Sequence, residues 1–170
     1  MTKTSYAIAI GSNRRHHRHG SPRQVITAAI AALSQKKGLH VRAVGPTITT
    51  RAVGPAGRSF ANAALLVRSK KSPGAILSLL KKMEVDFGRR RTRRWGPRVL
   101  DLDIILWSEG MWADGTLAVP HPAYRTRAFV LDPLEQIIPD WRDPRDHLTI
   151  RQIRARLRRA KPVDPASPAA

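Results

Sequence analysis

The chain contains no cysteine. This absence excludes a disulfide framework and a thiolate zinc site, and it fits a reducing compartment. Long hydrophobic runs are also missing: the first apolar run, from Tyr6 to Ile10, is too short for the core of a signal peptide. No stretch approaches the roughly 20 apolar residues of a membrane-spanning helix. We therefore expect a cytoplasmic protein without a membrane partner.

Acidic residues are scarce: 12 Asp and Glu stand against 31 Lys and Arg, and the formal net charge is +19. A protein of this charge attracts anions such as nucleotides, nucleic acid or an acidic membrane surface. Most of the basic residues are Arg, which suits bidentate contacts to phosphate. Because they occur in several unrelated segments, part of the excess is equally well explained as a solvated surface enriched in Arg.

The length of 170 residues is enough to bury a real core, and we expect one domain over residues 1–160 and a disordered tail over 161–170. Hydrophobic periodicity and two Ser-Pro helix starts predict the secondary structure. In chain order, the expected elements are a strand over 4–13, a helix from Ser21-Pro22 to Gly38, a β segment over 40–50 interrupted at Gly45-Pro46, a strand over 60–69, a helix over 72–88, a strand over 96–107, and helices near 125–137 and over 149–160.

The order β-α-β-β-α-β matches the ferredoxin-like arrangement. We therefore expect an α+β fold in which helices pack on an antiparallel sheet, with extra helices at the C-terminal end. Loops are expected over 14–20, 51–59 and 89–97, and again from residue 108 to Pro120. Of these, the loops over 51–59 and 89–95 are expected to be mobile in the free protein.

The segment GPRVLDLDIILW, residues 96–107, sets two aspartates in a run that otherwise reads as a buried strand. Residues two apart in a strand share a face, so Asp101 and Asp103 point the same way. The opposite, apolar face is then expected to consist of Leu100, Leu102, Ile104 and Leu106.

The paired aspartates have two interpretations. Each aspartate pairs with an arginine, or the two hold Mg²⁺ with hard carboxylate oxygens while phosphate oxygens complete its octahedron. The second is favoured because the strand is flanked by Arg89, Arg90, Arg91, Arg93, Arg94 and Arg98. An acid pair beside an arginine cluster is typical of a phosphoryl-transfer site. The chain has neither a P-loop nor a kinase-type glycine-rich loop, which excludes both familiar kinase classes.

Four motifs together resemble one enzyme family over about residues 5–160: AIAIGSN at the start, FANAAL in the middle, WGPRVLDLDIILW, and VPHPAYRTRAFVLDPLEQIIP at 119–139. The family is the 6-hydroxymethyl-7,8-dihydropterin pyrophosphokinases (HPPK) of folate biosynthesis. The resemblance implies transfer of the terminal diphosphate of ATP to the pterin hydroxymethyl group, with release of AMP. It also implies ATP as co-substrate, two Mg²⁺ ions as cofactor, and a monomer whose partners are the two small molecules.

The resemblance also implies roles for individual residues. Asp101 and Asp103 resemble the family's metal ligands and, with Arg89 and Arg98, its catalytic residues. Residues similar to the family's ATP contacts are Glu84, Arg91, Trp95, Arg98, Ile104, His121 and Arg127. Residues similar to its pterin pocket are Gly11, Thr50, Val53, Phe60, Asn62 and Phe129. The chemistry agrees, because a flat heterocycle suits two aromatic faces and an amide at its polar edge.

Several features keep other interpretations open. Taken singly, Phe60 and Phe129 are more often plain core aromatics. The loop TTRAVGPAGRSF lacks the family's usual Thr-x-Pro pattern and Gln, which leaves a catalytically degenerate paralogue open, and Lys81 stands where relatives often have a neutral or amide residue. The three histidines of RRHHRHG, residues 14–20, are interpreted as part of a solvated loop rather than as a metal site.

A nucleic-acid-binding module is the alternative from a different class. The segments RRRTRRW and RQIRARLRRAK offer phosphate contacts and one stacking Trp, and they explain the excess charge well. Two aspartates on one strand face, however, would repel a phosphate backbone in the absence of metal. We therefore do not favour this alternative.

Overall fold

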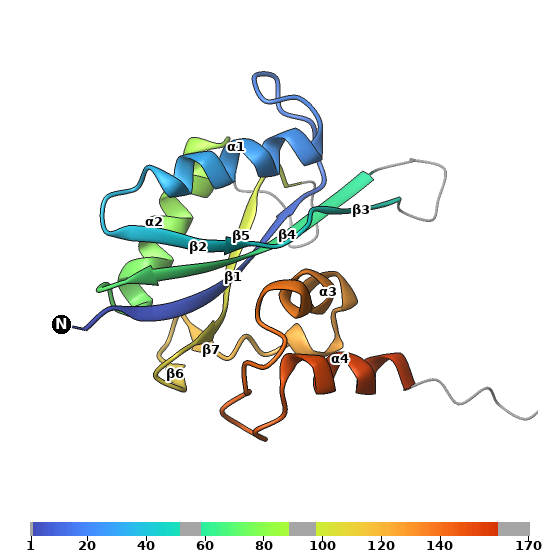
Figure 1. Ribbon diagram of the computed structural model, residues 1–170. Coiled ribbons are helices and arrows are strands. Elements are labelled where there is room, and N and C mark those ends of the chain that lie inside the picture. The colour runs from blue at the N-terminus through green and yellow to red at the C-terminus, as the bar shows by residue number, and fades with distance from the viewer. Residues whose placement is uncertain (1, 52–58, 89–97, 160–170) are drawn as a thin grey trace, which may run out of the picture.

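The computed structural model describes residues 2–51, 59–88 and 98–159 (Figure 1). The loops expected to be mobile fall almost wholly outside these ranges, as does the expected disordered tail. The elements are β1 (Thr4–Ser12), α1 (Pro22–Ser34), β2 (Leu39–Val44), β3 (Ile48–Arg51), β4 (Ser59–Ser69), α2 (Pro73–Asp86), β5 (Asp101–Trp107), β6 (Trp112–Ala113), β7 (Ala118–Val119), a 3-10 turn η1 (Tyr124–Thr126), α3 (Ala128–Ile137) and α4 (Ile150–Arg159).

The main sheet is antiparallel throughout, with the strand order β2-β4-β1-β5. β2 pairs with the C-terminal half of β4, and β3 pairs with its N-terminal half. The interruption at Gly45-Pro46 separates these two strands, as expected, because proline cannot donate to a strand ladder. The order confirms the ferredoxin-like βαββαβ arrangement.

Both expected Ser-Pro helix starts are confirmed. Ser21 caps α1 by accepting the N–H of Gln24, whose side chain in turn accepts the N–H of Ser21. Ser72 caps α2 in the same way through the N–H of Ala75. α1 ends at Ser34, earlier than expected, and Gly38 serves the following turn with a φ of 82°.

Hydrophobic side chains pack on both faces of the sheet. Residues of α1 and α2, such as Ile26 and Leu80, form one core with Ile8 of β1. On the other face, residues of α3 and α4, such as Leu131 and Ile150, form a second core. Figure 1 shows this layering, with α1 and α2 on one side of the sheet and α3 and α4 on the other. Among the described residues, none of the helices is long and apolar enough to cross a membrane.

One expectation for the aspartate strand is wrong. Leu100, Leu102 and Ile104 pack into the core beneath α1 and α2, but Leu106 packs into the core on the other face. The cause is a β-bulge: Ala7 pairs with Leu106 while the next residue, Ile8, pairs with Ile104. The extra residue reverses the alternation of side chains at the end of the strand. Asp101 and Asp103 precede the bulge and keep their common face.

The C-terminal third differs from expectation in two places. The segment expected to be a loop before Pro120 contains a hairpin of β6 and β7, whose turn is closed by Asp114 Oδ1 accepting the N–H groups of Thr116 and Leu117. The helix expected near 125–137 is divided into η1 and α3 because the backbone of Arg127 is extended. α4 is confirmed, with Ile150 and Ile153 buried.

The close approach of Gly45 to α3 generates a stability prediction. A Cβ at Gly45 would lie 2.7 Å from the carbonyl oxygen of Pro133, which is helix backbone and cannot turn aside. We expect Gly45→Ala to lower the free energy of unfolding by about 1–3 kcal/mol, measured by urea denaturation. The matched control is Gly74→Ala on α2, where a Cβ meets nothing within 4 Å. That change is expected to be neutral or to stabilise by up to about 1 kcal/mol. Equal effects of the two substitutions would contradict the close packing of Gly45 on α3.

Candidate active site

A cavity of about 890 Å³ lies where the ends of β1, β4 and β5 meet the start of α3. Its volume falls within the usual range for small-molecule sites. The residues that line it are Ala9, Ile10, Gly11, Ser12, Asn13, Phe60, Asn62, Ala63, Lys81, Arg98, Asp101, Asp103, Ile105, His121, Arg127, Phe129 and Val130.

The floor of the cavity is hollow because the central strand carries small residues there. Gly11 pairs with Asn62 on one side and with Asp101 on the other, so these three residues form one row across the sheet. Ala9 pairs with Asp103 in the next row on the same face. A Cβ at Gly11 would lie only 3.2 Å from Oδ1 of Asn62. Glycine at this position therefore leaves room for the amide side chain.

The two aspartates differ in their surroundings. Oδ1 of Asp101 lies 2.9 Å from Nη1 of Arg98, and both side chains are about one-third exposed. For Asp103, burial raises the pKa, and the nearby charge of Asp101 raises it further. His121, Lys81 and Arg127 oppose this shift without reversing it. No ion pair joins Asp103 to a residue within the described ranges. Within the described residues, the arginine-pairing interpretation thus fits Asp101 but not Asp103.

Arg98 is held in place by the end of β1. The side-chain Oδ1 of Asn13 accepts the N–H of Arg98 at 2.7 Å, and the N–H of Asn13 is 3.1 Å from the carbonyl oxygen of Arg98. These two hydrogen bonds join the GSN and GPR motifs. They bring the guanidinium to the cavity beside Asp101.

His121 follows β7 and reaches the cavity next to Asp103. Its backbone N–H donates to the carbonyl oxygen of Ile105 at 2.9 Å, and its Nδ1 accepts the N–H of Ala123 at 3.1 Å. Burial lowers the pKa of His121, against the opposing effect of Asp103. Because Nδ1 accepts, the ring donates through Nε2.

Glu84 supports the edge of the aspartate strand from α2. Its buried Oε1 accepts the backbone N–H of Leu102 at 2.8 Å and lies 3.0 Å from Nζ of Lys81. Lys81 Nζ also lies 3.5 Å from the carbonyl oxygen of Leu102. Glu84 and Lys81 thus bind the N–H and the carbonyl oxygen of Leu102, which lies between the two aspartates. Lys81 then reaches the cavity, while Glu84 does not line it.

Aromatic and amide groups form the opposite wall. Phe60 and Asn62 lie two apart on β4, so they share a face. Phe129 at the start of α3 is 43% exposed, and the guanidinium of Arg127 lies 5.9 Å from the centre of its ring. An aromatic so exposed is not a core residue. Phe129 is therefore available to a ligand in the cavity.

The structure brings most of the expected site residues together. Gly11, Phe60, Asn62, Arg98, Asp101, Asp103, His121, Arg127 and Phe129 all line the cavity. Three others do not: Glu84 is buried behind the strand, Ile104 packs into the core on the opposite face, and Thr50 pairs with Phe60 without lining the cavity. The expected residues Val53, Arg89, Arg91 and Trp95 lie outside the described residues.

Lys81 and Asn13 are two of the cavity residues that sequence reasoning missed. Lys81 was noticed only as a departure from the family pattern, although its place one turn before an acidic residue on the same helix predicts an ion pair. Asn13 belongs to the GSN motif, but its bond to Arg98 joins residues 85 positions apart. No local pattern in the sequence predicts such a contact.

The donors of the cavity suit a hard cation that shares its ligands with a substrate. Within the described ranges, no group of three or more His, Cys, Asp or Glu side chains could hold a metal ion unaided. Asp101 and Asp103 offer carboxylate oxygens on one face, and Asp103 is buried beside a like charge. Mg²⁺ is usually bound by one or two carboxylates, with waters and phosphate oxygens completing the octahedron. The aspartate pair fits that ion.

The histidine-rich loop lies at the surface, as predicted for a solvated loop, and it also makes ring contacts. The rings of His17 and His19 lie 4.3 and 4.7 Å from that of His16, and His19 stacks on Phe87 at 5.0 Å. Nδ1 of His16 accepts the N–H groups of Arg18 and His19. The loop therefore packs against the C-terminal end of α2.

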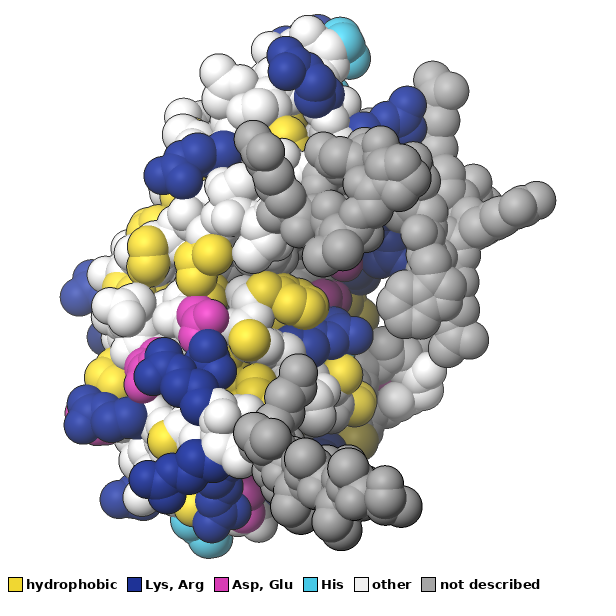
Figure 2. Space-filling view, turned by 90° about the vertical axis from the view of Figure 1, so that its right-hand side faces the viewer, with side chains coloured by type: hydrophobic (Ala, Val, Ile, Leu, Met, Phe, Trp, Pro, Cys, Tyr) yellow, Lys and Arg dark blue, Asp and Glu magenta, His cyan; other side chains and the backbone are white. Residues whose placement is uncertain are grey.

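The positive charge seen in the sequence is spread over the surface rather than confined to the cavity. Figure 2 shows Lys and Arg side chains at the top, middle and bottom of one face, with fewer acidic side chains between them. Part of the charge near α4 is paired: Arg154 binds Asp132, and Arg158 lies 3.6 Å from Glu135. The distribution agrees with a solvated surface enriched in Arg.

Comparisons with known proteins agree on one family. The family model described as 7,8-dihydro-6-hydroxymethylpterin-pyrophosphokinase (HPPK) matches residues 7–139. The 2-amino-4-hydroxy-6-hydroxymethyldihydropteridine pyrophosphokinase of Pseudomonas aeruginosa is 38% identical over 138 residues, covering 81% of this chain and 82% of the relative. The protein of the same name from Synechocystis is 39% identical over 128 residues, covering 75% of this chain and 66% of the relative.

Solved structures share the fold. An HPPK-DHPS in complex with substrates superposes with a TM-score of 0.70 at 12% identity over 92% of this chain, and the Plasmodium falciparum HPPK-DHPS with pteroate gives 0.64 at 11% over 91%. This chain spans 45% and 42% of the length of those two chains. At such low identity, the similarity concerns the fold alone.

The raised pKa of Asp103 predicts how stability changes with pH. Below the ordinary carboxyl pKa of 3.8, Asp103 is protonated in both folded and unfolded chains. As the pH rises, the unfolded chain releases this proton first. The folded state therefore loses stability between the unfolded and the folded pKa of Asp103, and it does not regain that stability at higher pH. We expect Asp103→Asn in EDTA-containing buffer to be more stable than the parent at pH 7, with the difference vanishing below about pH 3.8.

The measurement is urea denaturation across this pH range. Asp140→Asn is the control, because Asp140 has the same carboxylate but is 78% exposed on the surface. It should show no comparable gain. If Asp103→Asn is instead the less stable protein at pH 7, Asp103 forms a stabilising ion pair and the interpretation above is wrong.

Proposed function

Because this chain belongs to the 7,8-dihydro-6-hydroxymethylpterin-pyrophosphokinase family, we propose that it transfers diphosphate from ATP to the hydroxymethyl group of 6-hydroxymethyl-7,8-dihydropterin. The products are AMP and the pterin diphosphate, an intermediate of folate biosynthesis. One observation carries the proposal: two carboxylates, several cationic or neutral nitrogen donors and two aromatic rings line a single cavity. Each group matches one part of this reaction.

Asp101 and Asp103 are the proposed metal-binding residues. Their carboxylates lie in adjacent rows on the same face, and the burial of Asp103 beside Asp101 disfavours two negative charges without a cation. When bound, Mg²⁺ neutralises phosphate charge and orients the diphosphate for transfer. The proposal includes two such ions, as in the family. It assigns both aspartates to them.

Arg98, His121, Arg127 and Lys81 are the proposed phosphate-binding residues. All four line the cavity around the aspartate pair. Arginine donates two parallel N–H bonds to phosphate oxygens, whereas lysine acts as a point charge. His121 adds a donor through Nε2, because its Nδ1 accepts the N–H of Ala123. Donors fixed in advance stabilise the charge that develops on the phosphates during transfer.

Phe60, Phe129 and Asn62 are the proposed pterin-binding residues. The two rings offer apolar faces to a flat heterocycle, and the amide of Asn62 can both donate and accept at its polar edge. Gly11 contributes by leaving the floor open beneath Asn62. This wall lies across the cavity floor from Asp101, so a pterin bound there and phosphates bound at the aspartates would share one cavity.

In the proposed reaction, the hydroxymethyl oxygen loses its proton and forms a bond to the β-phosphorus of ATP. The bond from that phosphorus to the oxygen retained by AMP breaks. The chain's part is to bind both substrates in one cavity and align them, which accounts for a large share of such catalysis. All the residues assigned above belong to one chain, and the proposal is a monomeric enzyme.

Five further assignments rest on the family resemblance alone. Arg89 is proposed to be a catalytic residue, Arg91 and Trp95 to contact ATP, and Val53 and Thr50 to contact the pterin. Glu84 and Ile104 are proposed to affect ATP binding through the strand that carries the aspartates, since neither side chain lines the cavity. Family membership does not favour the nucleic-acid-binding module as an alternative function.

The product distinguishes this function from ordinary kinase chemistry. The protein incubated with ATP, Mg²⁺ and 6-hydroxymethyl-7,8-dihydropterin should release AMP, not ADP, as measured by chromatography of the nucleotides. Asp103→Asn should lower the rate about 100-fold or more, the size of effect expected when one charged group is removed from a preorganised site. Asp140→Asn, an exposed aspartate elsewhere on the surface, should retain the parent rate.

Two results would contradict the proposal. Absence of AMP with the parent protein under any divalent metal would leave a catalytically degenerate paralogue. Full activity of Asp103→Asn would show that this carboxylate does not hold the metal. Circular dichroism of each variant checks that the fold is retained.

A further inference from the structure

The segment between His121 and Arg127 contains little regular structure, yet both of its ends line the cavity. Inside it, η1 makes one turn: the N–H of Tyr124 lies 3.3 Å from the carbonyl oxygen of His121, and the N–H of Arg127 lies 3.2 Å from that of Tyr124. One turn of this kind is weakly held by itself. The orientation of His121 and Arg127 therefore depends on what holds η1.

A buried carboxylate holds it. Asp143 is completely buried, and its Oδ2 accepts the hydroxyl of Tyr124, which is itself 1% exposed. The guanidinium of Arg125 pairs with the same oxygen. The other oxygen, Oδ1, accepts the N–H of Arg145 at 2.7 Å. Two consecutive side chains of η1 thus meet one carboxylate from another part of the chain.

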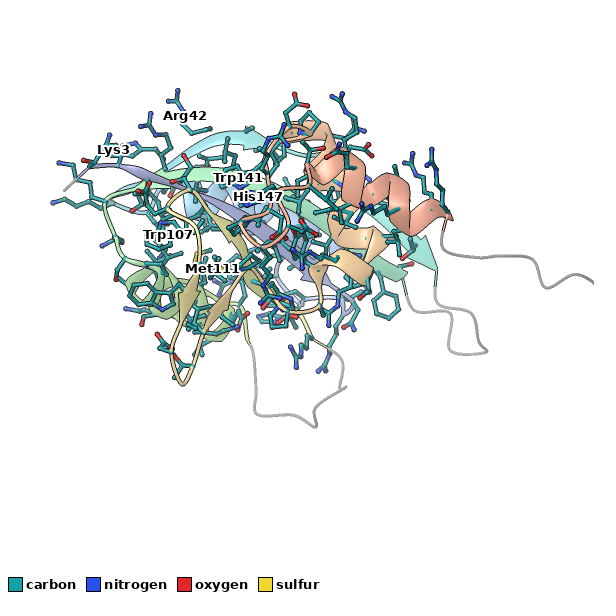
Figure 3. The ribbon with its side chains drawn as sticks, turned by 90° about the horizontal axis from the view of Figure 1, so that it is seen from below. Lys3, Arg42, Trp107, Met111, Trp141 and His147 are labelled. Atoms are coloured by element: carbon teal, nitrogen blue, oxygen red, sulfur yellow. The ribbon has the colours of Figure 1, made fainter. Side chains whose placement is uncertain are left out.

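The loop that carries Asp143 is closed on itself. The N–H of Asp143 donates to the carbonyl oxygen of Leu148 at 2.8 Å, and the N–H of Ile150 donates to that of Trp141 at 3.0 Å. Figure 3 labels Trp141 and His147, which bracket Asp143 in this loop. The loop leads directly into α4, whose Ile150 and Ile153 are buried in the core beneath the sheet. The hydrogen bonds of the loop and the buried start of α4 therefore hold Asp143 in place against η1.

Burial makes the contact specific. A buried carboxylate without partners is costly, and the partners of Oδ2 come from η1. Through its two oxygens, the carboxylate of Asp143 joins η1 to its own loop. Burial and the hydrogen bond to Asp143 both raise the pKa of Tyr124, so its hydroxyl remains a donor at all ordinary pH values. The network holds η1 in one arrangement only.

We propose that Asp143 and Tyr124 are positioning residues for the phosphate-binding side of the cavity, acting through η1 on His121 and Arg127. This inference rests on the proposed function, because it assigns ATP phosphates to those two residues. The proposal distinguishes the phosphate-binding side of the cavity from the pterin-binding side. Of the proposed pterin-binding residues, Phe60 and Asn62 belong to β4 in the middle of the sheet, and Phe129 alone belongs to the segment that follows η1.

The test is Tyr124→Phe, which removes one hydroxyl and keeps the ring. Tyr6→Phe is the matched control: Tyr6 is equally buried, and its hydroxyl donates to the carbonyl oxygen of Lys71 at 2.6 Å, outside the cavity. Both variants lose one buried hydrogen bond and should lose melting temperature to a similar extent. Only Tyr124→Phe should change the kinetic constants.

We expect Tyr124→Phe to lower kcat/KM for ATP about tenfold while KM for the pterin changes less than about twofold. Asp143→Asn, which is isosteric, should act in the same direction and more strongly. Dissociation constants for a non-hydrolysable ATP analogue with Mg²⁺, measured by calorimetry, should rise in parallel. This binding assay needs no turnover, so a failure of the proposed reaction does not hide the result.

Two outcomes would overturn the inference. If Tyr124→Phe loses melting temperature but keeps both kinetic constants and the affinity for the analogue, the network is only structural. If KM for the pterin rises as much as KM for ATP, the network supports the whole site rather than the phosphate side. If Asp143→Asn does not fold, Tyr124→Phe decides between these outcomes unaided.

Discussion

The repulsion between two carboxylates on one strand face is the constraint around which this site is built. Asp103 is buried beside Asp101, and its raised pKa records the cost. The surroundings reduce that cost without removing it: Arg98 pairs with Asp101, while Lys81 and Arg127 lie close enough to oppose the shift. The cavity therefore favours additional positive charge beside Asp103. In the proposed function, a metal ion bound together with phosphate supplies this charge.

The strand that carries the aspartates is an edge strand, and its free edge is occupied. Glu84 and Lys81 of α2 bind the backbone of Leu102, between the two carboxylates. An edge held by a buried glutamate cannot pair with another chain there, and it cannot shift its register without breaking a charged hydrogen bond. The contacts from α2 and the hydrogen bond between Asn13 and Arg98 therefore hold the aspartate strand from two sides: from α2 and from the end of β1.

Local chemistry made much of the fold predictable. Ser21 and Ser72, each followed by Pro, began helices as expected, and the alternation from Leu100 to Ile104 placed the aspartates on one face. Leu106 was misplaced because a β-bulge depends on the partner strand, which the sequence of β5 does not reveal. Motif resemblance found most of the cavity, including His121 and Phe129. It could not find Lys81, because that side chain reaches the cavity only through the packing of α2 on β5.

The order of the strands along the chain has a consequence for synthesis. β1 is central and pairs with β4 and β5, which are 55 and 97 residues further along when counted from its first residue, Thr4, to Ser59 and Asp101. A nascent chain that has emerged only through α2 can form the helix-covered half of the sheet, including Phe60 and Asn62, but it has no acid pair. The pairing of β5 with β1 joins residues far apart in the sequence, and pairing of this kind is entropically slow. The full set of cavity residues therefore exists only after β5 and the segment with Arg127 and Phe129 have been synthesised.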